Sequence, residues 1–161
     1  MDNTGRLVFS ADLPLVMRPE IEALFFFNPR QPFRREGIHA AIAHAGMPEI
    51  AENGDKVWID LPSGTTQCLF ACDKGLESLK AVGVVLYNRP TFNTIAITHV
   101  AVDPDYAYGG EHAKLNVLTR LLERVVATAS SIKGVTRIQL PYRNGRCLRV
   151  TTRESARRDE P

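Results

Sequence analysis

The sequence predicts a single domain of the α/β (α+β) class, in which helices cover both faces of a mixed, mostly antiparallel twisted sheet. Three observations lead to this prediction. Short β-rich runs follow one another closely between residues 56 and 102, as in strands joined by short turns. A long amphipathic run then separates the strand at 94–102 from another at 135–142. Strand, crossover helix and strand form a βαβ unit, which places one parallel pair at the centre of the sheet.

The length and composition fit one globular domain. The chain has 161 residues, of which 44% are hydrophobic and 24% are charged. The formal net charge of +2 does not point to nucleic acid or membrane. No apolar run approaches the roughly 20 residues of a membrane span, and the first residues lack the basic flank and apolar core of a signal peptide. We therefore expect a cytoplasmic protein with neither a nucleic-acid nor a membrane partner.

Two helices are predicted near the N-terminus, after a first strand at 6–13. The first helix covers residues 20–27 and follows Pro19, which suits the first helical position. The second covers residues 32–45 and ends at Gly46. Arg30, Arg34 and Arg35 form a small basic cluster around its start. This cluster has two interpretations, attraction of an acidic ligand or an ordinary solvated helix face.

The middle of the chain is predicted to be a series of strands. Residues 49–55 are read as a polar loop with a turn at Asn53-Gly54. The runs at 56–61 and 66–73 are strands, and their short connection favours a hairpin between them. A further strand covers 79–88, before the central strand at 94–102. Cys68 and Cys72 have the wrong spacing for a metal site, so we expect buried thiols and no metal.

The stretch from Thr94 to Ile132 is the part around which the fold is expected to be organised. Proline cannot donate to a sheet ladder, so Asp103-Pro104 ends the strand before a loop that contains Gly109 and Gly110. A helix is predicted from about residue 111 to 132, because apolar side chains recur there at spacings of three and four. The free backbone N–H groups at such a helix start bind anions, phosphate above all.

These residues resemble motif A of the GNAT superfamily of acyl-CoA N-acyltransferases. The resemblance rests on Val102-Asp103-Pro104, the glycine-containing loop, the helix and the strand that follows, together with the Val82-Gly83 pair upstream. It covers about half of the chain, residues 67–142. It implies that acetyl-CoA is the co-substrate, that its pyrophosphate binds at the loop and helix start, and that the acceptor is a small-molecule or protein amine.

The resemblance also implies which residues form the site. The backbone of the central strand would bind the pantetheine arm, and the loop would bind the pyrophosphate; the implied positions are Val100, Val102, Tyr108, Gly109, Gly110, His112 and Ala113. The general base and general acid are expected at His99 and Tyr142. By the strand period of two, Ala96, Thr98 and Val100 share a face with Val102, and His99 lies on the other face unless a bulge changes the register.

Two hypotheses about function follow. In the first, the chain is an N-acyltransferase that moves an acetyl group from acetyl-CoA to an amine. In the second, it is a catalytically inactive binding or regulatory module with the same fold. The second is favoured by the loop, in which only Gly110 matches the family pattern, while Ala107 and His112 replace its other two positions.

The domain is expected to span 1–142, followed by a short basic and partly disordered tail at 143–161, in which 147–150 is a possible strand. Since the sheet would then lack the family's final strands, a homodimer that completes it is also expected.

Overall fold

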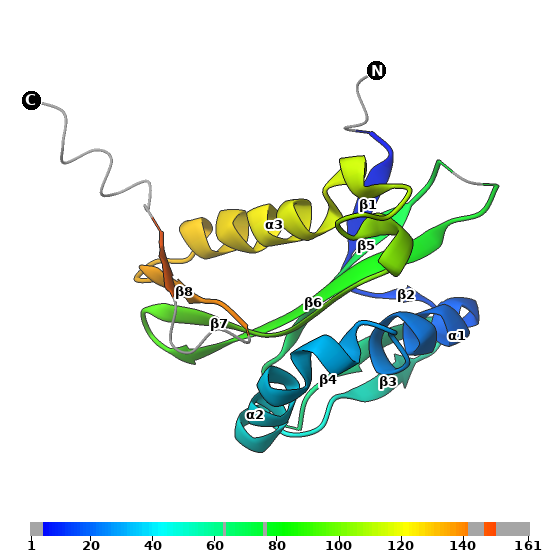
Figure 1. The fold of residues 1–161 in the computed structure, drawn as a ribbon. Coiled ribbons are helices and arrows are strands. Elements are labelled where there is room, and N and C mark those ends of the chain that lie inside the picture. Colours follow the sequence, from blue (N-terminus) through cyan, green and yellow to red (C-terminus); the bar gives the residue numbers. More distant parts are fainter. Residues whose placement is uncertain (1–4, 63, 76, 142–146, 151–161) are drawn as a thin grey trace, which may run out of the picture.

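Helices cover both faces of a six-stranded sheet in this computed structural model, which describes residues 5–62, 64–75, 77–141 and 147–150 (Figure 1). The strand order is β1-β5-β6-β7-β8-β9. Neighbouring strands are antiparallel except for β7 and β8, which are parallel and are connected through α3. The predicted mixed, mostly antiparallel sheet with one βαβ step is therefore confirmed. The strands are β1 (Leu7–Ser10), β5 (Gln67–Asp73), β6 (Lys80–Thr91), β7 (Thr94–Val102), β8 (Arg137–Gln139) and β9 (Cys147–Arg149).

A second, three-stranded sheet corrects two predictions for the middle of the chain. It has the order β2-β4-β3, with β2 at Leu13–Pro14, β3 at Glu49–Asn53 and β4 at Lys56–Asp60. The expected polar loop at 49–55 thus contains a strand, and β4 forms its hairpin with β3 rather than with β5. The turn of this hairpin contains Gly54 at φ +62°. Strand β3 was missed in the sequence because both ends of this strand are polar, as in a loop. They are exposed because β3 is an edge strand.

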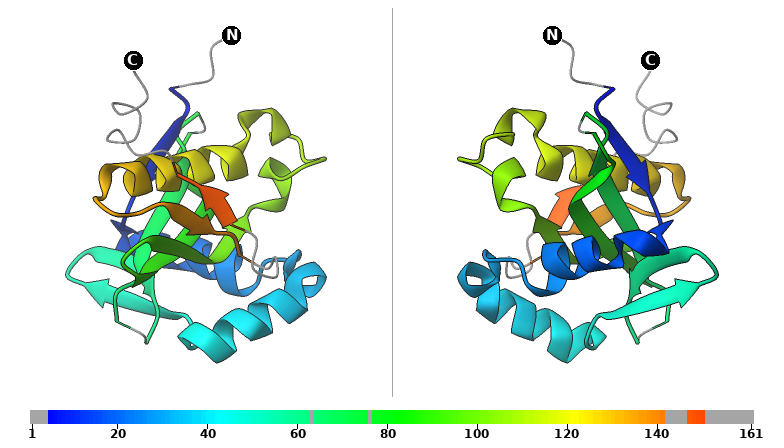
Figure 2. Two further views of the ribbon diagram at one scale, coloured as in Figure 1. Left: turned by 90° about the vertical axis from the view of Figure 1, so that its left-hand side faces the viewer. Right: turned by 90° about the vertical axis from the view of Figure 1, so that its right-hand side faces the viewer.

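The N-terminal helices cover one face of the large sheet (Figure 2). Helix α1 (Arg18–Ile21) continues into a π-helical segment, Glu22–Phe26, and a 3-10 turn at Gln31–Arg34 leads into α2 (Arg35–Ala45). Gly46 ends α2 at φ +90°, as predicted. Leu24 and Phe25 are buried against the sheet on this face. The thiols of Cys68 and Cys72 are buried there too, and burial raises the pKa of each to about 12.

Helix α3 (Val117–Ser131) covers the opposite face and begins later than predicted (Figure 2). Its buried side chains recur at intervals of four residues: Val117, Leu121, Val125 and Ala129. The helix lies so close to β6 that a Cβ atom at Gly83 would come 2.6 Å from Val117 Cγ1 and 2.9 Å from Leu121 Cδ1. Gly83 is therefore needed for close packing of α3 on the sheet.

The described C-terminal residues belong to the folded domain. Strand β9 pairs with β8, and Val150, which is 8% exposed, packs in the core beneath α3. The fold therefore extends to at least Val150, beyond the expected boundary at 142. Tyr142 and the rest of the expected tail, 143–146 and 151–161, lie outside the described residues. In the part of the chain that the structure describes, no helix is long and apolar enough to cross a membrane.

Replacing Gly83 by alanine tests the packing of α3 on β6. We expect Gly83→Ala to lower the free energy of unfolding by about 1–3 kcal/mol, because the added methyl group overpacks a filled core. Gly5→Ala is the control, since no atom lies within 4 Å of a Cβ built there. Urea unfolding of the two variants would measure the difference. Equal stability of both variants would contradict this packing argument.

Candidate functional site

A β-bulge at Thr98 sets which way the side chains of β7 point. In the pairing with β6, Leu86 is opposite His99 and Tyr87 is opposite Ile97, so Thr98 is an extra residue on β7. Ile97 packs beneath α3, whereas Thr98 lines a cleft on the α2 side. From the sequence, a bulge in this strand was only a condition under which His99 would change face, and the structure contains one.

Because of the bulge, the expectation that Ala96, Thr98, Val100 and Val102 share one face is wrong. Ala96 and Thr98 line the cleft on the α2 side, and Val100 and Val102 pack against the core beneath α3. His99 is on the α2 side with Phe25, so it remains on the face opposite to Val102. The period of two fails here because the extra residue shifts the alternation by one position.

Strand β7 continues well beyond its pairing with β8. The parallel ladder joins Thr94–Ala96 to Arg137–Gln139 and ends there, whereas β7 continues to Val102. The Asp103 N–H donates to Val82 O at 2.9 Å, on the β6 side. Backbone groups alternate between the two edges of an antiparallel strand, so those of Val100 and Val102 project from the edge that faces away from β6. This is the edge at which the pantetheine arm was expected.

Asn28 connects the N-terminal helices to the end of β7, a role that the sequence did not indicate. Its buried side chain donates through Nδ2 to Leu24 O at 2.8 Å and to Val102 O at 3.0 Å. Its Oδ1 accepts from the Arg30 N–H at 2.9 Å. The Val102 carbonyl is therefore already hydrogen-bonded within the chain. Only the Asn-Pro pair after the helix marked this position in the sequence.

His99, the expected general base, lies buried in the sheet. It is 2% exposed, and its ring meets Phe25 edge-on with 5.8 Å between the ring centroids. Burial lowers the pKa of His99 to about 4, so the imidazole is neutral at pH 7. It is not among the side chains that line the cleft on the α2 side. A catalytic role for His99 remains a prediction.

The loop between β7 and α3 uses many of its own amides. The N–H of His112 donates to Asp105 O at 2.7 Å, that of Gly110 to Ala107 O at 2.9 Å, and that of Ala113 to Gly110 O at 3.2 Å. The expected helix start at residue 111 is therefore wrong. The chain forms 3-10 turns first and reaches α3 after Asn116, a left-handed residue at φ 50°. The amides of Gly110, His112 and Ala113, which were among those predicted to bind pyrophosphate, are bonded within the loop, and their role in binding stays a prediction.

The two loop glycines are needed for different reasons. A Cβ atom at Gly110 would lie 2.5 Å or less from the carbonyl oxygens of Pro104 and Asp105. Gly110 therefore allows one turn of the loop to pack on another. Gly109 has open space around it but a φ of +84°, a left-handed conformation that glycine adopts without strain. Tyr108 is 97% exposed, and its carbonyl oxygen accepts a hydrogen bond from Arg30 at 3.1 Å.

A buried carboxylate, that of Asp73, anchors the start of this loop. The hydroxyl of Tyr106 donates to Asp73 Oδ2 at 2.7 Å, and the Arg6 guanidinium donates to both carboxylate oxygens at 2.7 and 2.8 Å. Burial alone would raise the pKa of Asp73, but the hydrogen bonds from Arg6 and Tyr106 outweigh it and lower this pKa to about 2. On its other side the Tyr106 ring contacts His112, at 4.8 Å between centroids.

Helix α3 begins directly after this loop, and its first amides have no acceptor within the helix. Its first intrahelical bond in the described structure runs from Arg120 N to Asn116 O. Val117, Leu118 and Thr119 precede this bond, so their N–H groups have no acceptor within the helix. Lys114 is exposed just before the helix. The helix start, with its amides, is therefore several residues further along than the sequence predicted.

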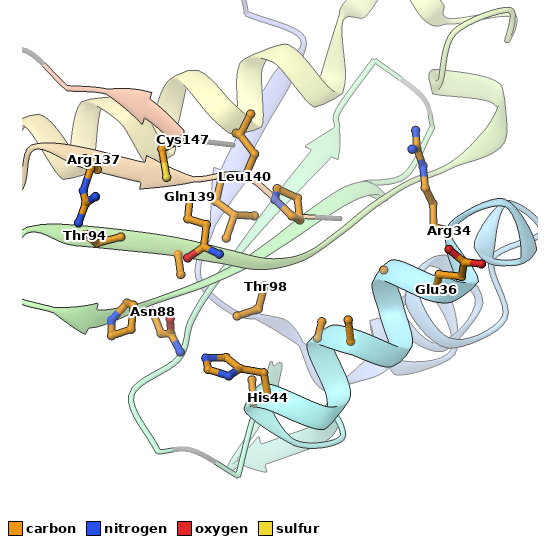
Figure 3. Close-up of a pocket in the computed structure, with 18 of the residues that line it drawn as sticks. Arg34, Glu36, His44, Asn88, Thr94, Thr98, Arg137, Gln139, Leu140 and Cys147 are labelled. Carbon is orange, nitrogen blue, oxygen red and sulfur yellow. The ribbon is translucent and has the colours of Figure 1, made fainter. Parts of the chain in front are cut away.

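A cleft of about 1090 Å³ lies on the other side of the sheet, between α2 and strands β6, β7 and β8 (Figure 3). In Figure 3, His44 on α2 faces Thr98 and the Gln139 carboxamide on the sheet, with Asn88 between the two layers. Arg34 and Arg137 lie at opposite ends of the cleft. Among the described residues, the side-chain oxygen of Asn88 is one of the few buried polar atoms without a hydrogen-bond partner.

The residues of this cleft were mostly missed by the sequence analysis. Asn88, Thr98 and Gln139 come from three strands that tertiary pairing brings together, so no spacing along the chain marks them. The basic cluster did identify Arg34 and Arg35, which line one end. In the described residues, no group of three or more His, Cys, Asp and Glu side chains is arranged to hold a metal ion.

The pH dependence of stability tests the environment of His99. The pKa of His99 is about 4 in the folded protein, whereas an unperturbed imidazole has a pKa of 6.5. Between these two pH values the histidine is protonated in the unfolded chain but neutral in the folded protein. Stability should consequently fall as the pH is lowered from about 6.5 to about 4. We expect His99→Gln to reduce this slope in thermal melts, compared with the wild type. An unchanged slope in His99→Gln would show that His99 is not the group responsible.

The two glycines of the loop can be separated by alanine substitution. Gly109→Ala should cost about 1–2 kcal/mol of stability through left-handed strain alone. Gly110→Ala should lower the stability more. Its Cβ would collide with backbone atoms of Pro104 and Asp105, which cannot move aside as a flexible side chain could. Chemical denaturation would measure both. If Gly110→Ala were the milder change, the inter-turn packing described above would be incorrect.

Comparisons with family models and curated proteins assign no family to this sequence. No protein-family model matches the sequence, and no curated protein matches it. The function is therefore argued from the architecture of the sheet, the loop and the cleft.

Proposed function

We propose that this protein is an acyl-CoA-dependent N-acyltransferase that transfers an acetyl group from acetyl-CoA to an amine. The observation that carries the proposal is the extension of β7 past the end of its parallel ladder with β8. Because the Val102 carbonyl already accepts from Asn28, the proposal uses the Val102 N–H, which projects from the edge away from β6. The pantetheine arm of CoA contains two amide groups that can accept from such an N–H. The resemblance of residues 67–142 to the GNAT superfamily agrees with this arrangement.

The parts of the proposed site follow one another along the chain. The thioester arm runs along the edge of β7 at Val100 and Val102, and the bulge at Thr98 lies at its end. The pyrophosphate lies at the start of α3, where the amides of Leu118 and Thr119 and the helix dipole favour an anion. Gly109, Gly110, His112 and Ala113 shape the loop beside it, and Tyr108 is exposed at its tip.

The reaction requires a neutral amine next to the thioester carbonyl. The amine nitrogen attacks the carbonyl carbon, the C–S bond breaks, and the sulfur leaves as a thiolate while the amine loses a proton. Backbone N–H groups at the β7 edge polarise the carbonyl oxygen. His99 is neutral at pH 7 and is the base in this proposal, and Tyr142 is the acid that protonates the thiolate. Water would have to relay the proton to His99, because that residue is buried.

A second candidate is a GNAT-like module that binds a ligand without turnover. It is favoured by one observation, namely that the amides of Gly110, His112 and Ala113 already bond within the loop. Measured CoA binding without release of free thiol, over a panel of amines, would support this second function.

The start of α3 offers a sharp test of CoA binding. Thr119→Glu places a carboxylate at the third helical position, where it favours the helix dipole by about 0.3–1 kcal/mol. The same charge repels pyrophosphate, so we expect unchanged or higher thermal stability and at least about tenfold weaker binding of acetyl-CoA. Thr119→Gln is the matched neutral control and should bind as the wild type does.

Calorimetric titration with acetyl-CoA and with CoA gives both affinities. Equal binding by Thr119→Glu would exclude the start of α3 as the pyrophosphate site. Absence of binding to the wild-type protein at millimolar ligand would overturn the acyltransferase proposal itself.

A further inference from the structure

The strand register places two rows of side chains side by side on the cleft face of the sheet. All of them line the cleft except Arg149, which continues the second row beyond the lining. Residues opposite one another on neighbouring strands lie on the same face, with Cβ atoms about 5 Å apart. The first row crosses the sheet from β6 to β9. The second row runs parallel to it and lies two residues away along β7, β8 and β9. The rows are Asn88, Ala96, Gln139 and Cys147, and then Thr91, Thr94, Arg137 and Arg149.

The second row contains an unfavourable pair of like charges. Arg137 on β8 and Arg149 on β9 are directly opposite each other, and both are exposed. Like charges at such positions destabilise a sheet. Within the described part of the chain, neither guanidinium forms an ion pair with a carboxylate. A bound anion between them would convert this repulsion into two charge-assisted hydrogen-bonding interactions.

The other charges of the cleft are mainly positive. Of the described residues that line it, three are arginines and one is a glutamate: Arg34, Arg35, Arg137 and Glu36. Arg34 and Glu36 lie at the end of the cleft away from Arg137 (Figure 3), so the glutamate does not neutralise the Arg137 end. The cleft therefore favours a negatively charged occupant.

The first row supplies polar groups for the same occupant. Asn88 and Gln139 flank Ala96, whose small side chain leaves space between the two carboxamides. The buried Asn88 side-chain oxygen has no hydrogen-bond partner among the described residues. Buried acceptors in folded proteins are rarely left without a donor. An N–H group of a ligand in the cleft would supply one.

We propose that the cleft binds an anionic acceptor, a primary amine whose own molecule carries a carboxylate or phosphate that is held between Arg137 and Arg149. This proposal rests on the proposed acyltransferase function and names its substrate class. The amine lies towards the bulge at Thr98, four residues along β7 from Thr94 in the arginine row. At about 3.3 Å per residue this separation is roughly 13 Å, which suits an acidic peptide better than a free α-amino acid.

Matched acceptors test the proposal in a thiol-release assay with acetyl-CoA. The probes are the amidated peptides Ala-Ala-Glu-Glu and Ala-Ala-Gln-Gln, and free glutamate beside free glutamine. We expect the acidic peptide to be preferred by about ten- to hundredfold in kcat/KM, as charge-assisted bonds to arginine imply. The preference for glutamate over glutamine can also exceed the preference for the acidic peptide over the neutral one. That result would identify a small acceptor with the same anionic chemistry.

One double arginine variant and one control locate the effect. Arg137→Gln with Arg149→Gln should abolish the preference for the acidic peptide over the neutral one. Arg124→Gln, on α3 at the opposite face of the sheet, removes the same charge and should keep the preference. Equal acylation of acidic and neutral acceptors by the wild type would overturn the proposal and leave the acyltransferase function standing.

Binding of the peptides alone separates the two proposals. Calorimetry without acetyl-CoA should show that the acidic peptide binds the wild type and that the double variant loses this binding. If acetyl-CoA fails to bind but this result holds, the anionic site stands and the acyltransferase function falls. If neither peptide binds and no transfer occurs, the anionic site is overturned together with the function.

Discussion

The buried carboxylate of Asp73 is the constraint on which the candidate cofactor site depends. A charge without exposure to solvent is tolerated only when it is paired and hydrogen-bonded, and here Arg6, Tyr106 and the Gly75 N–H all donate to it. These donors come from the start of the chain, from the turn after β5 and from the loop after β7. The carboxylate thereby fixes where that loop begins, and the internal bonds of the loop then fix where α3 starts.

The bulge at Thr98 gives the central strand two different functional surfaces. Before it, the small side chain of Ala96 lies in the floor of the cleft between two carboxamides. After it, Val100 and Val102 pack beneath α3 and present their backbone groups at the edge away from β6. In the proposed reaction the acceptor and the thioester approach the same strand from these two directions and meet at the bulge. An extra residue in a strand is a common means of redirecting side chains next to a site.

The electrostatics of the two regions are complementary to the two proposed substrates. The start of α3 and Lys114 favour the pyrophosphate, and the arginine pair of β8 and β9 favours an anionic acceptor. His99 is buried, so in the proposed reaction it accepts the proton through water; its low pKa keeps it neutral at pH 7 but makes it a weak base. The two anion sites are on opposite faces of the sheet, which separates the negative groups of the two substrates from each other.

The sequence by itself determined the class of fold and the order of its main elements. Hydrophobic spacing located α3, the β-rich runs located the central strands, and the prolines and Gly46 located several ends, because these signals depend on neighbours in the chain. Tertiary structure alone decided the partners of β4, the start of α3 and the composition of the cleft. Asn88, Gln139 and Arg149 have no local signal, since their juxtaposition depends on the register of four paired strands. Gly110 matched a motif, yet its position is explained by the packing of one turn on another.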